Sequence, residues 1–157
     1  MRKQKPTKND KLYIFDITLS PDSPLAKKKT KVLRTISILN RQSLYDLAES
    51  IVDSFDFYFD HCFGFFDNLK NWTDSLNSYE LFVDIPDVAC DSPESKSVKK
   101  TKVQDLFSIN DKMLFLFDYG DNWEFVVQLK KIDNPDIKKS YPLLIDSSGK
   151  APKQYPD

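Results

Sequence analysis

Hydrophobic positions along the chain follow two periods, and the clearest stretch has the period of an α-helix. Within residues 43–57, apolar side chains recur at the spacing of one helical face. They are Leu44, Leu47, Ala48, Ile51, Val52 and Phe55. Ser43 stands just before this stripe and Asp46 three residues later, an arrangement in which each side chain can accept an unpaired backbone N–H. The pattern predicts an amphipathic helix with Ser43 as its N-cap.

The other hydrophobic stretches alternate or are β-rich, as expected of strands. Residues 11–19 and 32–39 alternate and predict one hairpin. Residues 112–132 contain two apolar runs around a Gly-Asp-Asn turn and predict a second hairpin. Further strands are predicted over residues 57–67, 79–85 and 143–146, and a short helical turn over residues 103–107.

The order of these elements indicates the fold class. Strands and helices do not alternate, so we expect an α+β protein with a mostly antiparallel or mixed sheet and one main packed helix. A β-grasp-like arrangement or an α/β roll would fit this order. Residues 1–10 are polar and predict a disordered N-terminal tail, followed by a single domain over residues 11–157.

Composition narrows the classes of function. The net charge is −1 and the isoelectric point about 5.9, which gives the whole chain no drive toward polyanions. Cys62 and Cys90 form no CxxC pair, which is typical of reduced thiols. No apolar run is long enough to cross a bilayer, so we expect a cytoplasmic protein without a membrane partner. The sequence also lacks a P-loop and the GxSxG and HExxH motifs.

Three stretches resemble the plasmid pRiA4b ORF-3-like family. They are residues 43–65, 113–129 and 141–157, and the specific motif is Asp-Tyr-Gly-Asp-Asn-Trp-Glu at residues 118–124. The resemblance covers nearly all of residues 11–157 and implies an α+β fold. It implies little about activity, although some members accompany plasmids or insertion elements. Where the family often has two histidines after the helix, this chain has His61 and then Phe63, which weakens a paired-imidazole site.

Acidic residues and the only histidine are the candidates for catalysis. Asp118, Asp121 and Glu124 crowd the predicted tip of the second hairpin. Three carboxylates there could bind a hard cation or perform acid–base chemistry, or they could simply fix the turn by accepting backbone N–H groups. His61 is a candidate general base. One imidazole does not make a usual metal site, so the sequence assigns no metal and no other cofactor.

Aromatic and basic residues are the candidates for binding. Tyr119 and Trp123 could line a ligand surface, although the alternation of Trp123 with the apolar positions that follow also favours a place in the core. Two basic loops could contact a phosphate backbone if they face together, or could be solvated loops. The lysines selected in them are Lys28, Lys31, Lys99 and Lys100.

Three functions follow from these features. The first is a non-catalytic binding or adaptor module with an unknown protein or small-molecule partner. The second is a nucleic-acid-associated accessory protein of a mobile element. The third is a metal-using, hydrolase-like enzyme at the acidic hairpin tip. The sequence leaves enzymatic activity open but favours its absence, and the distance from His61 to the 118–124 tip separates these alternatives.

Overall fold

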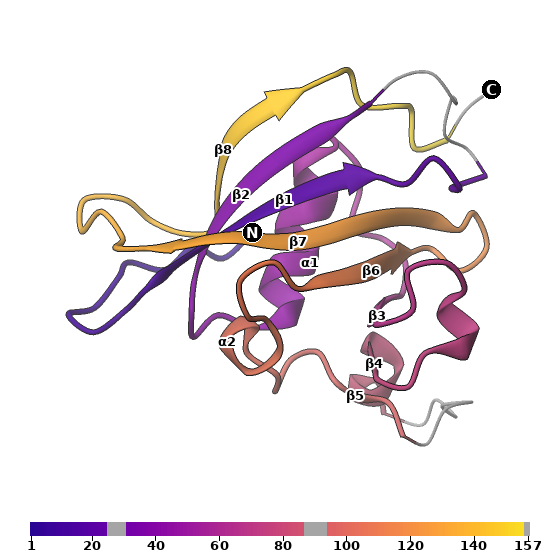
Figure 1. Ribbon diagram of the computed structural model, residues 1–157, viewed down its shortest axis with the longest axis horizontal. Coiled ribbons are helices and arrows are strands. Elements are labelled where there is room, and N and C mark those ends of the chain that lie inside the picture. The colour runs from indigo at the N-terminus through magenta and orange to yellow at the C-terminus, as the bar shows by residue number, and fades with distance from the viewer. Residues whose placement is uncertain (25–30, 87–93, 156–157) are drawn as a thin grey trace.

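One sheet organises the structure, a computed structural model that describes residues 1–24, 31–86 and 94–155 (Figure 1). The described strands lie in the order β5-β4-β3-β6-β7-β1-β2-β8. They are β1 (Leu12–Leu19), β2 (Leu33–Leu39), β3 (Phe63–Phe66), β4 (Ser78–Glu80), β5 (Lys96–Ser97), β6 (Lys112–Phe117), β7 (Trp123–Asp133) and β8 (Leu143–Ser148). Only β4 and β5 pair in parallel. The α+β class with a mixed sheet is confirmed, and the β-grasp or roll arrangement stays a prediction.

Helix α1 (Leu44–Ser54) is the predicted amphipathic helix and lies across one face of the sheet (Figure 1). The Ser43 hydroxyl accepts the Asp46 N–H and the Asp46 carboxylate accepts the Ser43 N–H, both at 3.1 Å, which confirms the cap. The helix ends before residue 57 because Asp56 turns the chain with a φ of 58°. Shorter helices are α2 (Val103–Leu106), η1 (Trp72–Asp74) and η2 (Leu81–Asp84). In the described part of the chain, no helix is both long and apolar enough to span a membrane.

The helical stripe is buried against the middle of the sheet, as predicted. Leu47, Ile51 and Phe55 are each 0% exposed. The ring of Phe55 lies 4.7 Å from that of Phe125 on β7, and Trp123 on the same strand is also fully buried. On the opposite face, a second apolar cluster joins β3 and β6 to the segment that carries η1. Because both faces of β6 are covered, its residues from 113 to 117 are all buried instead of alternating.

Two predicted strands are shorter in the structure than in the sequence pattern. In the 57–67 stretch only β3 forms, because the backbone of Tyr58 is bound by the side chain of Gln154 instead of a neighbouring strand. In the 79–85 stretch, β4 ends at Glu80 and η2 follows. There the Asp84 carboxylate accepts the Ser97 hydroxyl and the Val98 N–H, so a side chain replaces strand pairing.

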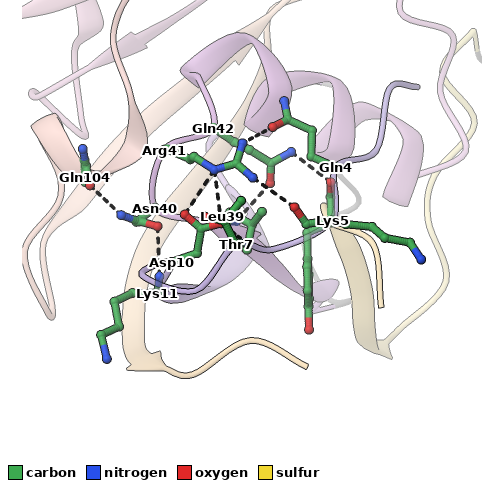
Figure 2. Close-up of polar contacts among 11 residues, drawn as sticks. Gln4, Lys5, Thr7, Asp10, Lys11, Leu39, Asn40, Arg41, Gln42 and Gln104 are labelled. Carbon is green, nitrogen blue, oxygen red and sulfur yellow. Dashed lines mark hydrogen bonds and ion pairs between the residues drawn. The ribbon is translucent and has the colours of Figure 1, made fainter. Parts of the chain in front are cut away.

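The N-terminal segment is anchored, contrary to the prediction of a disordered tail. Gln4 and Tyr141 exchange two backbone hydrogen bonds of 2.8 Å. The Asp10 carboxylate accepts the Thr7 N–H at 2.7 Å and Arg41 Nε at 3.1 Å (Figure 2). Composition predicted a free tail because the segment buries little apolar surface. Polar contacts with residues far along the chain hold it instead.

Candidate functional site

His61 and Asp118 meet at one end of the sheet because β3 and β6 are antiparallel neighbours. Phe63 on β3 lies opposite Phe117 on β6, so the residues just before β3 face those just after β6. The Asp118 N–H donates to the Cys62 carbonyl at 2.9 Å. His61 Nε2 lies 3.5 Å from Asp118 Oδ2. The structure therefore brings the only histidine to the hairpin tip that the sequence singled out.

The Asp118 carboxylate serves both the turn and the site. Asp118 has a left-handed φ of 64°, and its Oδ1 accepts the N–H groups of Gly120 and Asp121 at 3.0 and 3.2 Å. This is the turn chemistry that the sequence offered as an alternative. Oδ2 of the same carboxylate is the atom near His61. The turn thus orients one oxygen toward the imidazole.

Asp60 and Tyr155 complete the cluster on the other side of the imidazole. His61 Nδ1 lies 2.7 Å from Asp60 Oδ1, and the Tyr155 hydroxyl donates to Asp60 Oδ2 at 2.7 Å. Gln154 positions Tyr155, because its side-chain amide accepts the Tyr58 N–H at 2.7 Å and donates to the Tyr58 carbonyl at 3.1 Å. We call Asp60, His61, Asp118, Asp121 and Tyr155 the hairpin-end cluster.

Sequence reasoning missed three contributors to this site, namely Asp60, Gln154 and Tyr155. The last two lie 96 and 95 positions from their partners, beyond the reach of any local pattern. The available signal was the resemblance itself, because its closing stretch, residues 141–157, contains both.

The hairpin-end cluster carries more negative than positive charge. Among the described residues, Asp60 and Asp118 form ion pairs only with His61. The hydrogen bond to Asp60 raises the pKa of His61; burial opposes this, and the charges of Asp118, Asp60 and Asp121 add to it. Burial would raise the pKa of Asp60, but hydrogen bonds from Tyr155 and His61 outweigh it and lower that pKa. The carboxylates of Asp60 and Asp118 therefore flank the imidazole, and the charge of Asp121 adds to theirs.

Neither neighbouring nucleophile is activated. The hydrogen bond to Asp60 raises the pKa of the Tyr155 hydroxyl to about 12, so this group keeps its proton. Burial raises the pKa of the Cys62 thiol, which disfavours the thiolate that nucleophilic catalysis needs. Among the residues described, no group of three or more His, Cys, Asp or Glu side chains is arranged to hold a metal ion. The arrangement can thus bind and exchange protons.

Glu124 lies outside the hairpin-end cluster. Its side chain is buried, and Asn122 Nδ2 donates to it at 3.3 Å. Burial and the charge of Asp22 raise the pKa of Glu124. Within the described residues, no hydrogen bond or ion pair joins it to His61.

The two aromatic candidates take different places. Trp123 is fully buried, and its ring lies 4.9 Å from that of Phe57 in the core. Tyr119 is partly buried on the other face of the sheet, where its hydroxyl donates to Glu80 at 2.8 Å and its ring packs 5.6 Å from Trp72. Neither joins the cluster around His61.

The lysines selected from the sequence that the structure describes do not form one surface. Lys28 lies outside the described residues. Lys31 precedes the β2 residue Arg34, which binds the carbonyl of Ser54 at the end of α1. Lys99 lies over the ring of Tyr45 in the first turn of α1, and Lys100 follows it. Lys31 and the Lys99–Lys100 pair therefore lie near opposite ends of a helix about 16 Å long.

These features define a small α+β protein with one main helix on a mixed sheet and a polar cluster at the end of the central hairpin. The family model of the plasmid pRiA4b ORF-3-like protein matches residues 13–154, and the chain belongs to this family. A crystal structure of a protein of unknown function from Methanosarcina mazei Go1 is similar, with a TM-score of 0.70 and 22% identity. The match covers 92% of this chain and 73% of the other. A comparison with curated proteins found no match.

We expect His61 to titrate above the ordinary histidine value of about 6.5. As the only histidine, it can be followed by proton NMR without assignment. Asp60→Asn should lower its pKa most, and Asp118→Asn less, in the order of the two contacts. Because the folded-state pKa is raised, the stability contributed by His61 is full below the unfolded value and is lost as pH rises through the folded value. Equal titration in the wild type and both variants would contradict this geometry.

Proposed function

We propose that this protein is a non-catalytic binding module and that the hairpin-end cluster recognises a cationic group on its partner. The observation that supports this most directly is the single imidazole between the carboxylates of Asp60 and Asp118, at 2.7 and 3.5 Å. No lysine or arginine among the described residues forms an ion pair with either carboxylate. An ammonium or guanidinium group from outside could make that pairing.

The accessibility of the cluster favours binding at the surface. The side chains of His61 and Asp60 are 39% and 43% exposed, whereas that of Asp118 is 8% exposed. A partner would therefore contact two accessible groups and one buried carboxylate that the turn holds in place. Buried and fixed carboxylates lose little freedom on binding, which favours recognition of a cation. We place this module in the cytoplasm, as a single domain that the N-terminal segment joins through the hydrogen bonds of Gln4 with Tyr141.

Protonation of His61 should compete with the partner's cation. The protonated imidazole pairs with Asp60 and Asp118 and offsets one of their two negative charges, and it would repel a second positive charge. Because the His61 pKa is raised, this competition extends to a higher pH than for an ordinary histidine. Affinity for a cation should therefore increase as pH rises through the His61 pKa and reach a plateau above it.

The test uses N-acetyl-arginine amide as a probe, with N-acetyl-glutamine amide as its uncharged match. We expect the arginine compound to shift the His61 proton signal in a saturable way and to lower the His61 pKa. The glutamine compound should do neither. Asp60→Asn and Asp118→Asn should remove the response, while Asp133→Asn, an exposed carboxylate paired with Lys131, should leave it intact.

Two outcomes would contradict the proposal. One is a response to the arginine compound no larger than that to sodium chloride at equal ionic strength. The other is hydrolysis of simple ester or phosphate substrates that His61→Asn abolishes, which would favour the enzymatic alternative.

A further inference from the structure

A second charged surface lies at the other end of the sheet from the hairpin-end cluster. It consists of the N-terminal segment, residues 1–11, and the end of β7 with the loop toward β8, residues 130–139. We call these two segments the basic surface. β1 begins there and β6 ends at the hairpin tip, so the length of a six-residue strand, about 20 Å, separates the two regions. Figure 1 shows both loops projecting at the left-hand end of the sheet.

Hydrogen bonds from both segments keep them side by side. The backbone bonds between Gln4 and Tyr141 join the N-terminal segment to the residues just before β8. Lys11 Nζ donates to Asn134 Oδ1 at 3.0 Å, which joins the same segment to the end of β7. Two segments more than 120 positions apart in the sequence therefore present one surface.

Arg41 anchors the N-terminal segment to the rest of the protein. Its guanidinium contacts the Asp10 carboxylate, the Gln4 side chain and the Lys5 carbonyl (Figure 2). The side chains of Lys5 and Lys11 point away from this hub in Figure 2. The backbone is thus fixed while the ammonium groups face outward.

Positive charge dominates the basic surface. All nine of its cationic side chains are exposed, and they are Arg2, Lys3, Lys5, Lys8, Lys11, Lys130, Lys131, Lys138 and Lys139. It contains three carboxylates, those of Asp10, Asp133 and Asp136. Among the described residues, Lys131 alone of the nine forms an ion pair, with Asp133 at 3.1 Å.

The three carboxylates are occupied within the protein. Asp10 is buried and paired with Arg41, and Asp133 is paired with Lys131. Asp136 accepts the backbone N–H of Lys138 at 2.9 Å. Local contacts therefore use the negative groups and leave eight cations without an ion-pair partner among the described residues.

We propose that the basic surface binds the phosphate backbone of nucleic acid. Arrays of exposed lysine and arginine on a fixed backbone attract phosphates and release their counterions, without reading sequence. The overall charge of −1 hides this property, because 21 of the 24 acidic residues lie outside this surface, those of the hairpin-end cluster among them. Such a separation of charge would also orient the protein, basic end first, as it approaches a polyanion.

The distribution of apolar side chains favours nucleic acid over an anionic bilayer. The large exposed hydrophobic residues on this surface are Met1, Ile132 and Ile137, dispersed among the cations. Membrane-surface segments instead insert a continuous apolar face, which this arrangement does not provide. Two projecting loops with dispersed charges suit the phosphate backbone of a nucleic acid better than the flat surface of a bilayer.

The test is fluorescence anisotropy of a short labelled DNA duplex and a single strand of the same sequence, at several salt concentrations. We expect the full chain to bind at low salt and to weaken steeply between about 50 and 200 mM salt. The triple variant Lys3→Gln, Lys5→Gln, Lys8→Gln should bind about tenfold less tightly, with a salt slope reduced by about 0.9 for each lost duplex contact. The double variant Lys138→Gln, Lys139→Gln should weaken binding similarly.

The control matched to the double variant also removes two lysine charges, but elsewhere on the protein. Lys99→Gln, Lys100→Gln lies beside the first turn of α1 and should leave binding within about twofold of the wild type. Circular dichroism should show all variants folded, because every replaced lysine is exposed.

Three results would overturn the proposal. They are no salt-dependent binding to either nucleic acid, equal loss in the control and test variants, and binding to anionic vesicles without binding to nucleic acid. None of these depends on the hairpin-end cluster, so the proposal can fail independently of the proposed function.

Discussion

Replacement of Phe55 by alanine should reduce the free energy of unfolding by about 3–5 kcal/mol. Phe55 is fully buried at the end of α1, and its ring lies 4.7 Å from that of Phe125 on β7. Alanine would leave a cavity where the helix meets the middle of the sheet, and close packing on both sides would prevent the space from collapsing. Urea denaturation followed by circular dichroism measures this loss.

Tyr58 provides a matched control three residues later. It is also aromatic, but it is 75% exposed, so Tyr58→Ala should change the stability by less than about 0.5 kcal/mol. Its backbone bonds to Gln154 do not depend on the side chain. If both variants lost similar stability, the helix would not pack on the sheet as described.

Replacement of Arg34 by methionine should cost about 2–3 kcal/mol. Arg34 is buried on β2, and its guanidinium donates to the carbonyls of Ser54 at 2.8 Å, Ser148 at 3.2 Å and Gly149 at 3.0 Å. Helix α1 has no basic residue in its own last turn, so Arg34 supplies the positive charge that the negative end of a helix favours. Methionine would fill the space but leave these three carbonyls, and that of Leu33, without their donor.

Two effects oppose each other at Arg34, and their magnitudes decide the result. A guanidinium buried without a carboxylate has a desolvation penalty of several kcal/mol, and methionine would remove it. Hydrogen bonds that involve a charged group contribute about 1.5–3 kcal/mol each, and Arg34 makes several. We therefore expect the lost bonds to dominate. Lys31→Met, an exposed change just before the same strand, is the control, and a methionine variant as stable as the wild type would contradict this balance.

The candidate site was predicted in its parts but not in its assembly. His61 and Asp118 were each selected from the sequence, one as the only histidine and the other from an acidic turn. Their contact depends on the pairing of β3 with β6, which brings together two residues 57 positions apart (118 − 61). Asp60 and Tyr155 were missed because an isolated aspartate and a tyrosine near the chain end carry no pattern of their own.

The basic surface, like the candidate site, could not be predicted from the sequence as an assembly. The lysines of its N-terminal segment are visible in the sequence, but composition predicts a free tail, and nothing local relates them to Lys138 and Lys139. The hydrogen bonds of Gln4 with Tyr141 and of Lys11 with Asn134 create the shared surface.

By itself, the sequence determined the helix beginning after Ser43, the central hairpin and the α+β class. These depend on side-chain period, capping and turn chemistry, which act within a few residues. Tertiary structure alone decided where strands stop, what holds the N-terminal segment and which polar groups meet at His61. The physical reason is that contacts between distant residues depend on sheet order and on side-chain amides such as that of Gln154, whose partners no local pattern specifies.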